Sequence, residues 1–331
     1  MNRIDRRLFL LAAGTFALTS RLARAQPQGR IRRIGFMAQI ARPDPIESHF
    51  FGAIPRGLRD LGYVEGKSFA MDWRFAGGDV SALPKLAAEL VKTNPDVITT
   101  AGTLSAVAMR KATDSIPVVF GNVSDPVAAG LVNSLSRPGT NMTGMASLAI
   151  DLNPKLMEIL VDGLPGVSRL AILINPLHPA HLRSAAELEE TATKRRIKLI
   201  VVKATNPAEI ETAFAAIGRE KVGGLVLPLE GLFIQQRRQV AELSAKYRLP
   251  VASSDNELAA AGGLFSYGAN QGAMFLRMAS YVDNILKGAK PADLPVEQPS
   301  EFDFAINMKT ARTLGLAIPQ LVLIRANRII E

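Results

Sequence analysis

The sequence predicts an α/β protein of two similar lobes, each built on a doubly wound parallel β-sheet. Short β-branched runs alternate with longer amphipathic segments along the chain. Strand–helix–strand units of about 30 residues are typical of right-handed crossovers in a parallel sheet. Near-continuous apolar strands, such as residues 170–174, fit a sheet that is covered on both faces. Ten such strands are too many for one compact sheet, so we expect two.

The expected elements follow one another in regular order. We expect strands at residues 31–37, 68–74, 96–101, 116–120, 142–148, 169–174, 197–202, 223–227, 249–252 and 264–266. Helix patterns lie between them at residues 80–93, 104–114, 154–164, 179–195, 208–220 and 233–247. Pro55 interrupts a further helical pattern at residues 45–61 and should kink or divide it, because proline removes a backbone donor and clashes with the preceding turn.

The first 25 residues are typical of an export signal. A charged start precedes an apolar run at residues 8–18, and an Ala-x-Ala site ends at Ala25, before Gln26. The apolar run has eleven residues, fewer than the roughly 20 of a transmembrane helix. We therefore expect cleavage after Ala25 and a periplasmic location; an anchor that is never cleaved is the alternative.

The signal favours the twin-arginine route, because Arg6 and Arg7 are followed by Phe-Leu after one residue. Asp5 and Leu11 stand where that signal usually has Ser or Thr and Lys. A general secretory signal therefore stays open as the alternative.

Composition excludes several classes of function. Cysteine is absent, which excludes disulfides, thiolate metal sites, a cysteine nucleophile and a lipid anchor. The formal charge of +9 falls to +5 without the five arginines and one aspartate of the signal. No basic stripe with interleaved aromatic residues is present, so we expect no nucleic-acid partner. The 306 residues after Ala25 exceed what one core usually supports, which again favours two lobes.

The turns that follow the strands carry most of the polar candidates, because ligands of open α/β sheets bind beyond the carboxyl ends of the strands. In the 102–106 turn, Thr103 and Ser105 with free backbone N–H groups suit a carboxylate. The alternative for Thr103 is that it caps its own helix. Asp125 could meet a ligand ammonium or cap the next helix. The candidate ligand-binding residues are Gln39, Thr103, Ser105, Asn122, Ser124, Asp125, Asn175, Glu230, Asp255 and Tyr267.

Signatures of catalysis are poor. The chain has no Gly-x-Gly-x-x-Gly, no Walker loop and no Gly-x-Ser-x-Gly elbow. Ser254-Asp255-Asn256 matches a β-lactamase triplet without its companion motifs, and we interpret it as chance. His178 and His181 lie three residues apart, but only His49 remains elsewhere, so we interpret the pair as a surface loop rather than a metal site. We expect no catalytic residues, no metal and no cofactor.

An ordered series of segments resembles one family over essentially the whole mature chain. The segments are LRDLGYVEG (58–66), SDPV (124–127), RPGTNMTG (137–144), AGGLFSYG (261–268), YVDNILKGAKPADLPVEQP (281–299) and INMKTARTLGL (306–316). They are similar to the TrpX-like family of ABC-transporter substrate-binding proteins, which have a type I periplasmic-binding fold. Family members often have Asp directly after the Leu-Pro of the 223–227 strand, where this chain has Leu229 and then Glu230.

The resemblance implies two lobes that are joined by a multi-strand hinge and close over a small ligand. It implies an N-terminal lobe of residues 27–146 plus 270–293 and a C-terminal lobe of residues 147–269 plus 294–331. The chain would cross between them near residues 146–151, 267–270 and 294–299. Tyr267 would then lie at the hinge, where its ring either lines the cleft or packs the hinge edge.

The function implied by the resemblance is transport rather than catalysis. We expect a monomer without a membrane anchor, which binds an amino acid or an aromatic or organic acid and delivers it to an inner-membrane ABC permease. A periplasmic receptor for a membrane sensor kinase is the alternative, because its cleft would be the same and only the partner would differ. An exported α/β enzyme is a third hypothesis, which no acid–base constellation supports.

Overall fold

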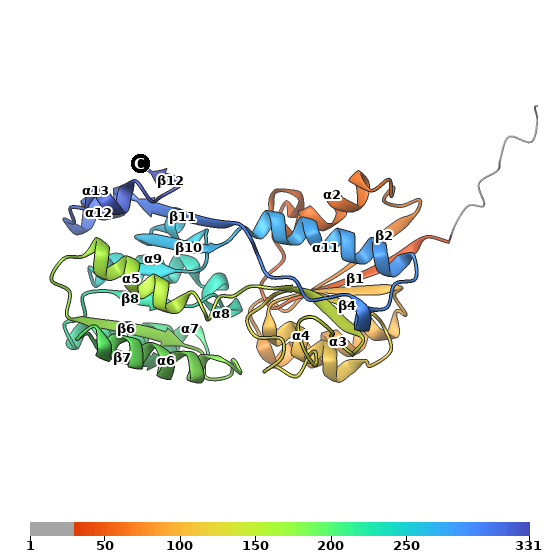
Figure 1. Cartoon of the computed structure of the whole chain (residues 1–331), viewed down its shortest axis with the longest axis horizontal. Helices are drawn as coiled ribbons and strands as arrows, with labels where there is room; N and C mark the ends of the chain where they lie inside the picture. The colour runs from red at the N-terminus through yellow and green to blue at the C-terminus, as the bar shows by residue number, and fades with distance from the viewer. Residues whose placement is uncertain (1–29) are drawn as a thin grey trace, which may run out of the picture.

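The computed structural model describes residues 30–331 and contains two β-sheets that lie side by side, each covered by helices (Figure 1). The expected export signal lies outside these described residues. Within them, no helix is both long enough and apolar enough to cross a membrane. The two-lobed α/β architecture predicted from the sequence is confirmed.

The first sheet is parallel throughout and has the strand order β2-β1-β3-β4-β5. Its strands are β1 (Arg32–Ala38), β2 (Phe69–Phe75), β3 (Val97–Ala101), β4 (Val118–Val123) and β5 (Met142–Ala146). The helices α2 (Ala53–Asp60) and α11 (Gln271–Leu286) pack together on one face, and α3 (Leu83–Lys92) and α4 (Thr103–Ala112) cover the other (Figure 1). Apolar clusters fill both faces, which explains why the strands are almost continuously hydrophobic.

The second sheet has the order β12-β11-β10-β9-β8-β6-β7. Its strands are β6 (Arg169–Ile174), β7 (Lys198–Lys203), β8 (Leu225–Leu227), β9 (Val251–Ser253), β10 (Phe265–Ala269), β11 (Phe302–Asn307) and β12 (Arg328–Ile330). Its helices are α5 (Asn153–Gly163), α6 (His181–Lys194), α7 (Pro207–Arg219), α8 (Gly231–Gln235), α9 (Arg237–Lys246), α10 (Leu258–Ala261), α12 (Met308–Leu314) and α13 (Gln320–Leu323). Apolar clusters again cover both faces of the sheet.

Three segments of the chain pass between the sheets: after β5, between β10 and α11, and before β11. Backbone hydrogen bonds tie these segments together. The N–H of Ala146 donates to the carbonyl of Glu297 at 2.9 Å, and the N–H of Asn270 donates to the carbonyl of Glu301 at 3.0 Å. The connection is therefore several strands wide, as the resemblance implied.

The second sheet differs from the prediction at one edge. β11 and β12 were not expected, and β11 pairs with β10 in the antiparallel sense. The physical reason is the path of the chain. β10 leaves the second sheet toward the hinge, whereas β11 enters the same sheet from the hinge, so the two neighbours run in opposite directions.

Two predicted helices are divided. The 233–247 pattern forms α8 and α9, which meet at Gln236. Before α2, residues 46–52 form two short 3₁₀ turns, η2 (Ile46–Ser48) and η3 (Phe50–Gly52). Pro55 lies in the first turn of α2, where backbone N–H groups lack a partner within the helix in any case, so its missing donor costs little there. The helical pattern is therefore divided where η3 ends and α2 begins, just before Pro55 and not at Pro55 itself.

Candidate functional site

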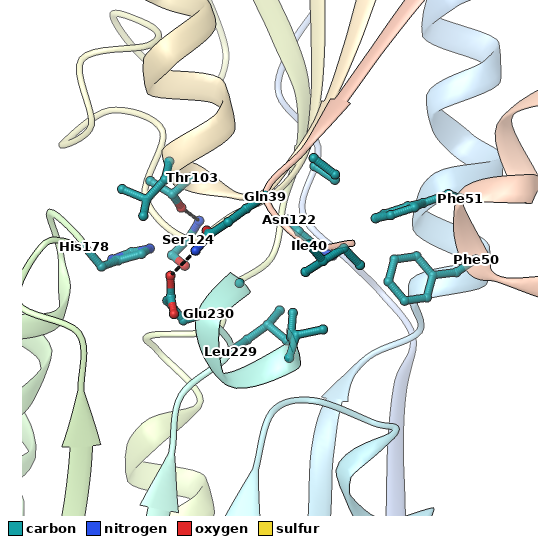
Figure 2. Close-up of a pocket in the computed structure, with 16 residues that line it drawn as sticks. Gln39, Ile40, Phe50, Phe51, Thr103, Asn122, Ser124, His178, Leu229 and Glu230 are labelled. Carbon is teal, nitrogen blue, oxygen red and sulfur yellow. Dashed lines mark hydrogen bonds between the residues drawn. The ribbon is translucent and has the colours of Figure 1, made fainter. Parts of the chain in front are cut away.

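A cleft lies between the two sheets, at the carboxyl ends of β1, β3 and β4 on one side and of β6 and β8 on the other (Figure 2). It holds about 510 Å³ of empty space, its open mouth included. The polar side chains that line it are Gln39, Thr103, Asn122, Ser124, His178 and Glu230. Both lobes contribute to it, and strand ends are where parallel sheets place ligands.

The polar side chains gather on one side of the cleft, where Gln39 and Glu230 meet across the two lobes (Figure 2). Nε2 of Gln39 donates to Oε1 of Glu230 at 3.3 Å. Gly231 permits this approach, because a Cβ at that position would lie 2.2 Å from Oε1 of Gln39. Any larger residue at position 231 would therefore displace the Gln39 side chain from Glu230.

Glu230 is a buried carboxylate that begins α8. Its Oε2 accepts the N–H of Leu232 at 2.7 Å, which caps the helix. The side chain is nearly inaccessible to solvent. Burial raises the pKa of the Glu230 carboxyl, and the hydrogen bonds from Leu232 and Gln39 only partly oppose it. A cationic group placed beside Glu230 would favour its ionised form.

The N-terminus of α4 faces the cleft without a side-chain cap. Gly102 precedes it at φ 89°, a backbone conformation that favours glycine, and nothing lies within 4 Å of where its Cβ would be. The hydroxyl of Thr103 accepts the N–H of Ser124 at 3.2 Å and so ties two strand-end turns together instead of capping its helix. The first N–H groups of α4 are therefore available to an anion.

Asn122 reaches the cleft because β4 is irregular. The register with β5 shifts between Phe120 and Val123, and Asn122 has a φ of 56°. Such a bulge re-aims a side chain. The amide nitrogen of Asn122 donates to Oε1 of Gln271, while its Oδ1 is buried without a partner.

The other side of the cleft is apolar. Phe50 and Phe51 lie there (Figure 2) and approach edge to face with ring centroids 4.8 Å apart. Phe51 also packs on Phe36, with ring centroids 4.7 Å apart. The remaining apolar side chains of the lining are Ala38, Ile40, Ala101, Leu104, Leu229 and Ile234. This side could not be predicted from the rule that ligands bind beyond strand ends, because Phe50 and Phe51 precede α2 rather than follow a strand.

His178 also lines the cleft, which corrects the prediction of a surface loop. His178 is 3% exposed and His181 is fully buried, and their rings stack with centroids 4.1 Å apart. The loop folds inward because ring nitrogens accept backbone hydrogens: the N–H of Ala180 donates to Nδ1 of His178 at 3.3 Å, and that of Asn175 to Nδ1 of His181 at 3.1 Å. Burial lowers the pKa of His178 to about 4.

Comparison with known proteins agrees with this geometry. The model of the family "ABC transporter substrate binding protein" matches residues 39–330. The chain belongs to this family. The expectation of a substrate-binding protein rather than an enzyme is therefore confirmed, and so is the resemblance on which it was based.

Relatives of this substrate-binding protein cover most of its length. A tyrosine-binding protein of Clostridioides difficile (strain R20291) is 25% identical over 262 residues, 79% of this chain and 75% of the relative. A conserved domain protein of Vibrio cholerae is 28% identical with a TM-score of 0.84, over 91% of this chain and all of the other. The ABC domain of Streptococcus pneumonia in complex with L-Trp is 25% identical with a TM-score of 0.82, over the same shares.

Two acidic candidates of this substrate-binding protein do not line the cleft, and each is paired with an arginine. Asp125 forms an ion pair with Arg183 of α6, which joins the lobes at the rim. Asp255 accepts two hydrogen bonds from Arg237, at 2.7 and 3.0 Å, within the second lobe. Neither partner could be identified from sequence spacing. Both carboxylates are therefore engaged with protein cations.

Three further candidates are also placed outside the cleft. Ser105 is fully buried inside α4, and its hydroxyl has no partner among the described residues. Asn175 is fully buried, and its Oδ1 accepts the N–H of Leu177 at 3.0 Å. Tyr267 stacks on Phe302, with centroids 5.8 Å apart and planes 11° from parallel. Its ring packs the hinge edge, the second of the two roles considered for it.

Metal chemistry has no candidate centre in the part of the chain that the structure describes. Within residues 30–331, no three His, Cys, Asp or Glu side chains come together in a group that could hold a metal ion.

Proposed function

We propose that this protein binds an aromatic L-amino acid, such as tyrosine or tryptophan, in the cleft between its lobes. The observation that carries the proposal is the division of the cleft into a polar side, with a single carboxylate, and an apolar side with two phenylalanines. An aromatic amino acid has the same division, with a charged end and an apolar ring. Relatives that bind tyrosine and L-Trp support the same class of ligand.

Glu230 is the proposed partner of the ligand's ammonium group. It is the only carboxylate among the side chains that line the described cleft. The ammonium would replace Gln39 as the partner of Oε1, while the Leu232 N–H keeps Oε2 in place. A charge-assisted hydrogen bond of this kind is stronger than the neutral amide contact that it replaces.

The ligand's carboxylate would bind at the N-terminus of α4. The ten-residue helix directs its first N–H groups and the positive end of its dipole into the cleft. The aromatic ring would then lie against Phe50 and Phe51 on the apolar side. Aromatic pairs add about 0.5–1.5 kcal/mol beyond the area they bury.

We propose that the protein works in the periplasm and delivers its ligand to an inner-membrane ABC permease. The signal expected at residues 1–25 and the family to which the chain belongs both support this. Mass spectrometry of protein recovered from the periplasm should find Gln26 at the N-terminus, and retention of residues 1–25 would contradict cleavage. Unchanged export after replacement of Arg6 and Arg7 by Lys would indicate the general secretory route.

A thermal-shift screen tests the ligand class. The panel holds the common L-amino acids, the D-isomers of the aromatic ones, and the analogues that lack the ammonium or the carboxylate. We expect L-tyrosine or L-tryptophan to give the largest shift, with about 2.7 kcal/mol of added stability at 100 times Kd. A panel in which only aliphatic amino acids stabilise the protein would contradict the proposal.

A further inference from the structure

The protonation state of His178 follows from its contacts. Nδ1 accepts the N–H of Ala180 at 3.3 Å, so this nitrogen carries no proton. The ring is 3% exposed, and burial lowers its pKa to about 4, so it is neutral at pH 7. The single proton of the neutral ring therefore lies on Nε2.

The orientation of the ring is also set. His178 stacks on His181, with the planes 22° from parallel, and Nδ1 of His181 is held in turn by the N–H of Asn175. Figure 2 shows the His178 ring pointing into the cleft, toward the polar side where Thr103 and Ser124 lie. Backbone contacts on both rings thus direct a fixed donor at the cleft.

Among residues 30–331, the His178 ring is hydrogen-bonded only through Nδ1, so its Nε2 donor is unpaired. The nearby carboxylate of Glu230 is hydrogen-bonded to Gln39 and Leu232 instead. Nε2 of His181 is buried without a partner, whereas Nε2 of His178 keeps accessible surface in a side chain that lines the cleft, so a bound molecule can reach it. The missing acceptor is expected to come with the ligand.

We propose that His178 donates its Nε2 hydrogen to a carboxylate oxygen of the ligand. The inference rests on the proposed function, which places the carboxylate at the N-terminus of α4, on the same polar side of the cleft. One carboxylate would then be held by α4 of the first lobe and by His178 of the second. His178 is thereby a specificity-determining residue, because it selects ligands that carry an acceptor at this point.

A bridged carboxylate also favours the closed arrangement. A ligand shifts the equilibrium between open and closed forms only by its differential affinity for the two. An amine without a carboxylate could still pair with Glu230, but it would leave the His178 donor unpaired in the closed cleft. Loss of the carboxylate therefore removes contacts to both lobes at once.

Two substitutions and two ligands test the proposal. His178→Leu removes the donor at similar size, and His178→Gln keeps an N–H donor on a side chain of similar reach. Leu182→Ala, at an exposed position in the first turn of α6, is the matched control. Each variant is titrated by calorimetry with L-tyrosine and, in competition, with tyramine, which keeps the ring and ammonium but lacks the carboxylate.

We expect His178→Leu to reduce the affinity for L-tyrosine about 10- to 100-fold, which is the usual effect of losing a hydrogen bond to a charged group. The affinity of His178→Gln for L-tyrosine should stay within about 3-fold of that of the unmodified protein. Tyramine should bind the unmodified protein and both His178 variants equally. An unchanged affinity of His178→Leu for L-tyrosine would overturn the proposal, and so would an equal loss for both ligands.

Failure of the proposed function is distinguishable from failure of this inference. If the unmodified protein binds an aliphatic amino acid instead of an aromatic one, the ligand class is wrong, and the same comparison of that acid with its decarboxylated amine still decides the role of His178. If it binds no carboxylate-bearing ligand, both proposals are overturned.

Discussion

Gln39 and Glu230 form a hydrogen bond across the cleft, with Nε2 of the amide 3.3 Å from Oε1 of the carboxylate. The amide follows β1 of the first sheet, and the carboxylate begins α8 beside the second. Opening of the lobes must separate these two groups. The bond therefore links the geometry of the site to the closure of the protein.

Glu230→Gln should reduce the affinity for an aromatic amino acid by at least about 30-fold, because removal of one partner of a buried charge pair typically costs 2–5 kcal/mol. The melting temperature of the unliganded variant should not fall, since burial already disfavours the charged form of Glu230. Calorimetric titration measures the first effect and a thermal melt the second. Glu257→Gln, at an exposed position of the same lobe, should leave both unchanged.

Phe50→Ala should reduce the affinity for an aromatic amino acid by about 10-fold, through lost ring contact and buried area. Phe50 is only half-buried, so the fold should tolerate the change better than one at Phe51. The affinity for a small amino acid such as alanine, measured by competition, should be unaffected. An equal loss for large and small ligands would mean that Phe50 supports the cleft without touching the ring.

The ion pair between Asp125 and Arg183 should favour the closed form slightly. Burial alone would raise the pKa of Asp125, but the Ala128 N–H and Arg183 outweigh it and the pKa is lowered. The Arg183 side chain is 51% exposed, so the pair contributes at most about 1 kcal/mol.

Asp125→Asn should therefore raise the apparent Kd by no more than about 5-fold, and this difference should shrink at high salt. Glu190→Gln is the matched control, because it removes one negative charge, as Asp125→Asn does, and breaks an exposed ion pair within α6 alone. If the control reduced the affinity for the ligand as much as Asp125→Asn does, the effect would come from net charge and not from closure.

Stability should fall in acid because of the buried histidines. The pKa of His178 is lowered from 6.5 to about 4, so the unfolded chain takes up a proton before the folded protein does. The contribution of neutral His178 to the free energy of unfolding is fully present above pH 6.5 and is lost as the pH falls toward 4. At about 1.4 kcal/mol per pKa unit it is on the order of 3 kcal/mol.

Denaturant unfolding at several pH values measures this loss. The His178→Gln variant should show a shallower decline between pH 6.5 and 4 than the unmodified protein. Part of the decline should remain in this variant, because burial also lowers the pKa of His181. Parallel curves for the two proteins would show that His178 titrates normally in the folded state.

Much of the fold could be predicted from the sequence because each strand of a covered parallel sheet is a nearly continuous apolar run. β6 was predicted with its observed bounds, and most other strands within a few residues. The strands that were not predicted, β11 and β12, form because of pairing between segments far apart in the sequence. β11 carries charge at Asp303 and is stabilised as a strand by the neighbour that it meets after the hinge.

The site could be predicted only in part. The rule that ligands bind beyond strand ends identified polar side chains such as Gln39 and Glu230 that line the cleft. It did not reveal which candidates are already paired, because Asp125 and Arg183 are 58 residues apart in sequence. It also missed the apolar side, since a Phe-Phe pair in a sequence indicates a core as readily as a cleft.

The measurement that tests the central claim most directly is hydrogen exchange of the backbone with and without saturating L-tyrosine or L-tryptophan. The central claim is that one ligand is held by both lobes. It predicts protection of the turn at residues 102–106 in the first lobe together with the 175–181 turn and α8 in the second. Protection confined to one lobe, at the same saturation, would contradict the claim.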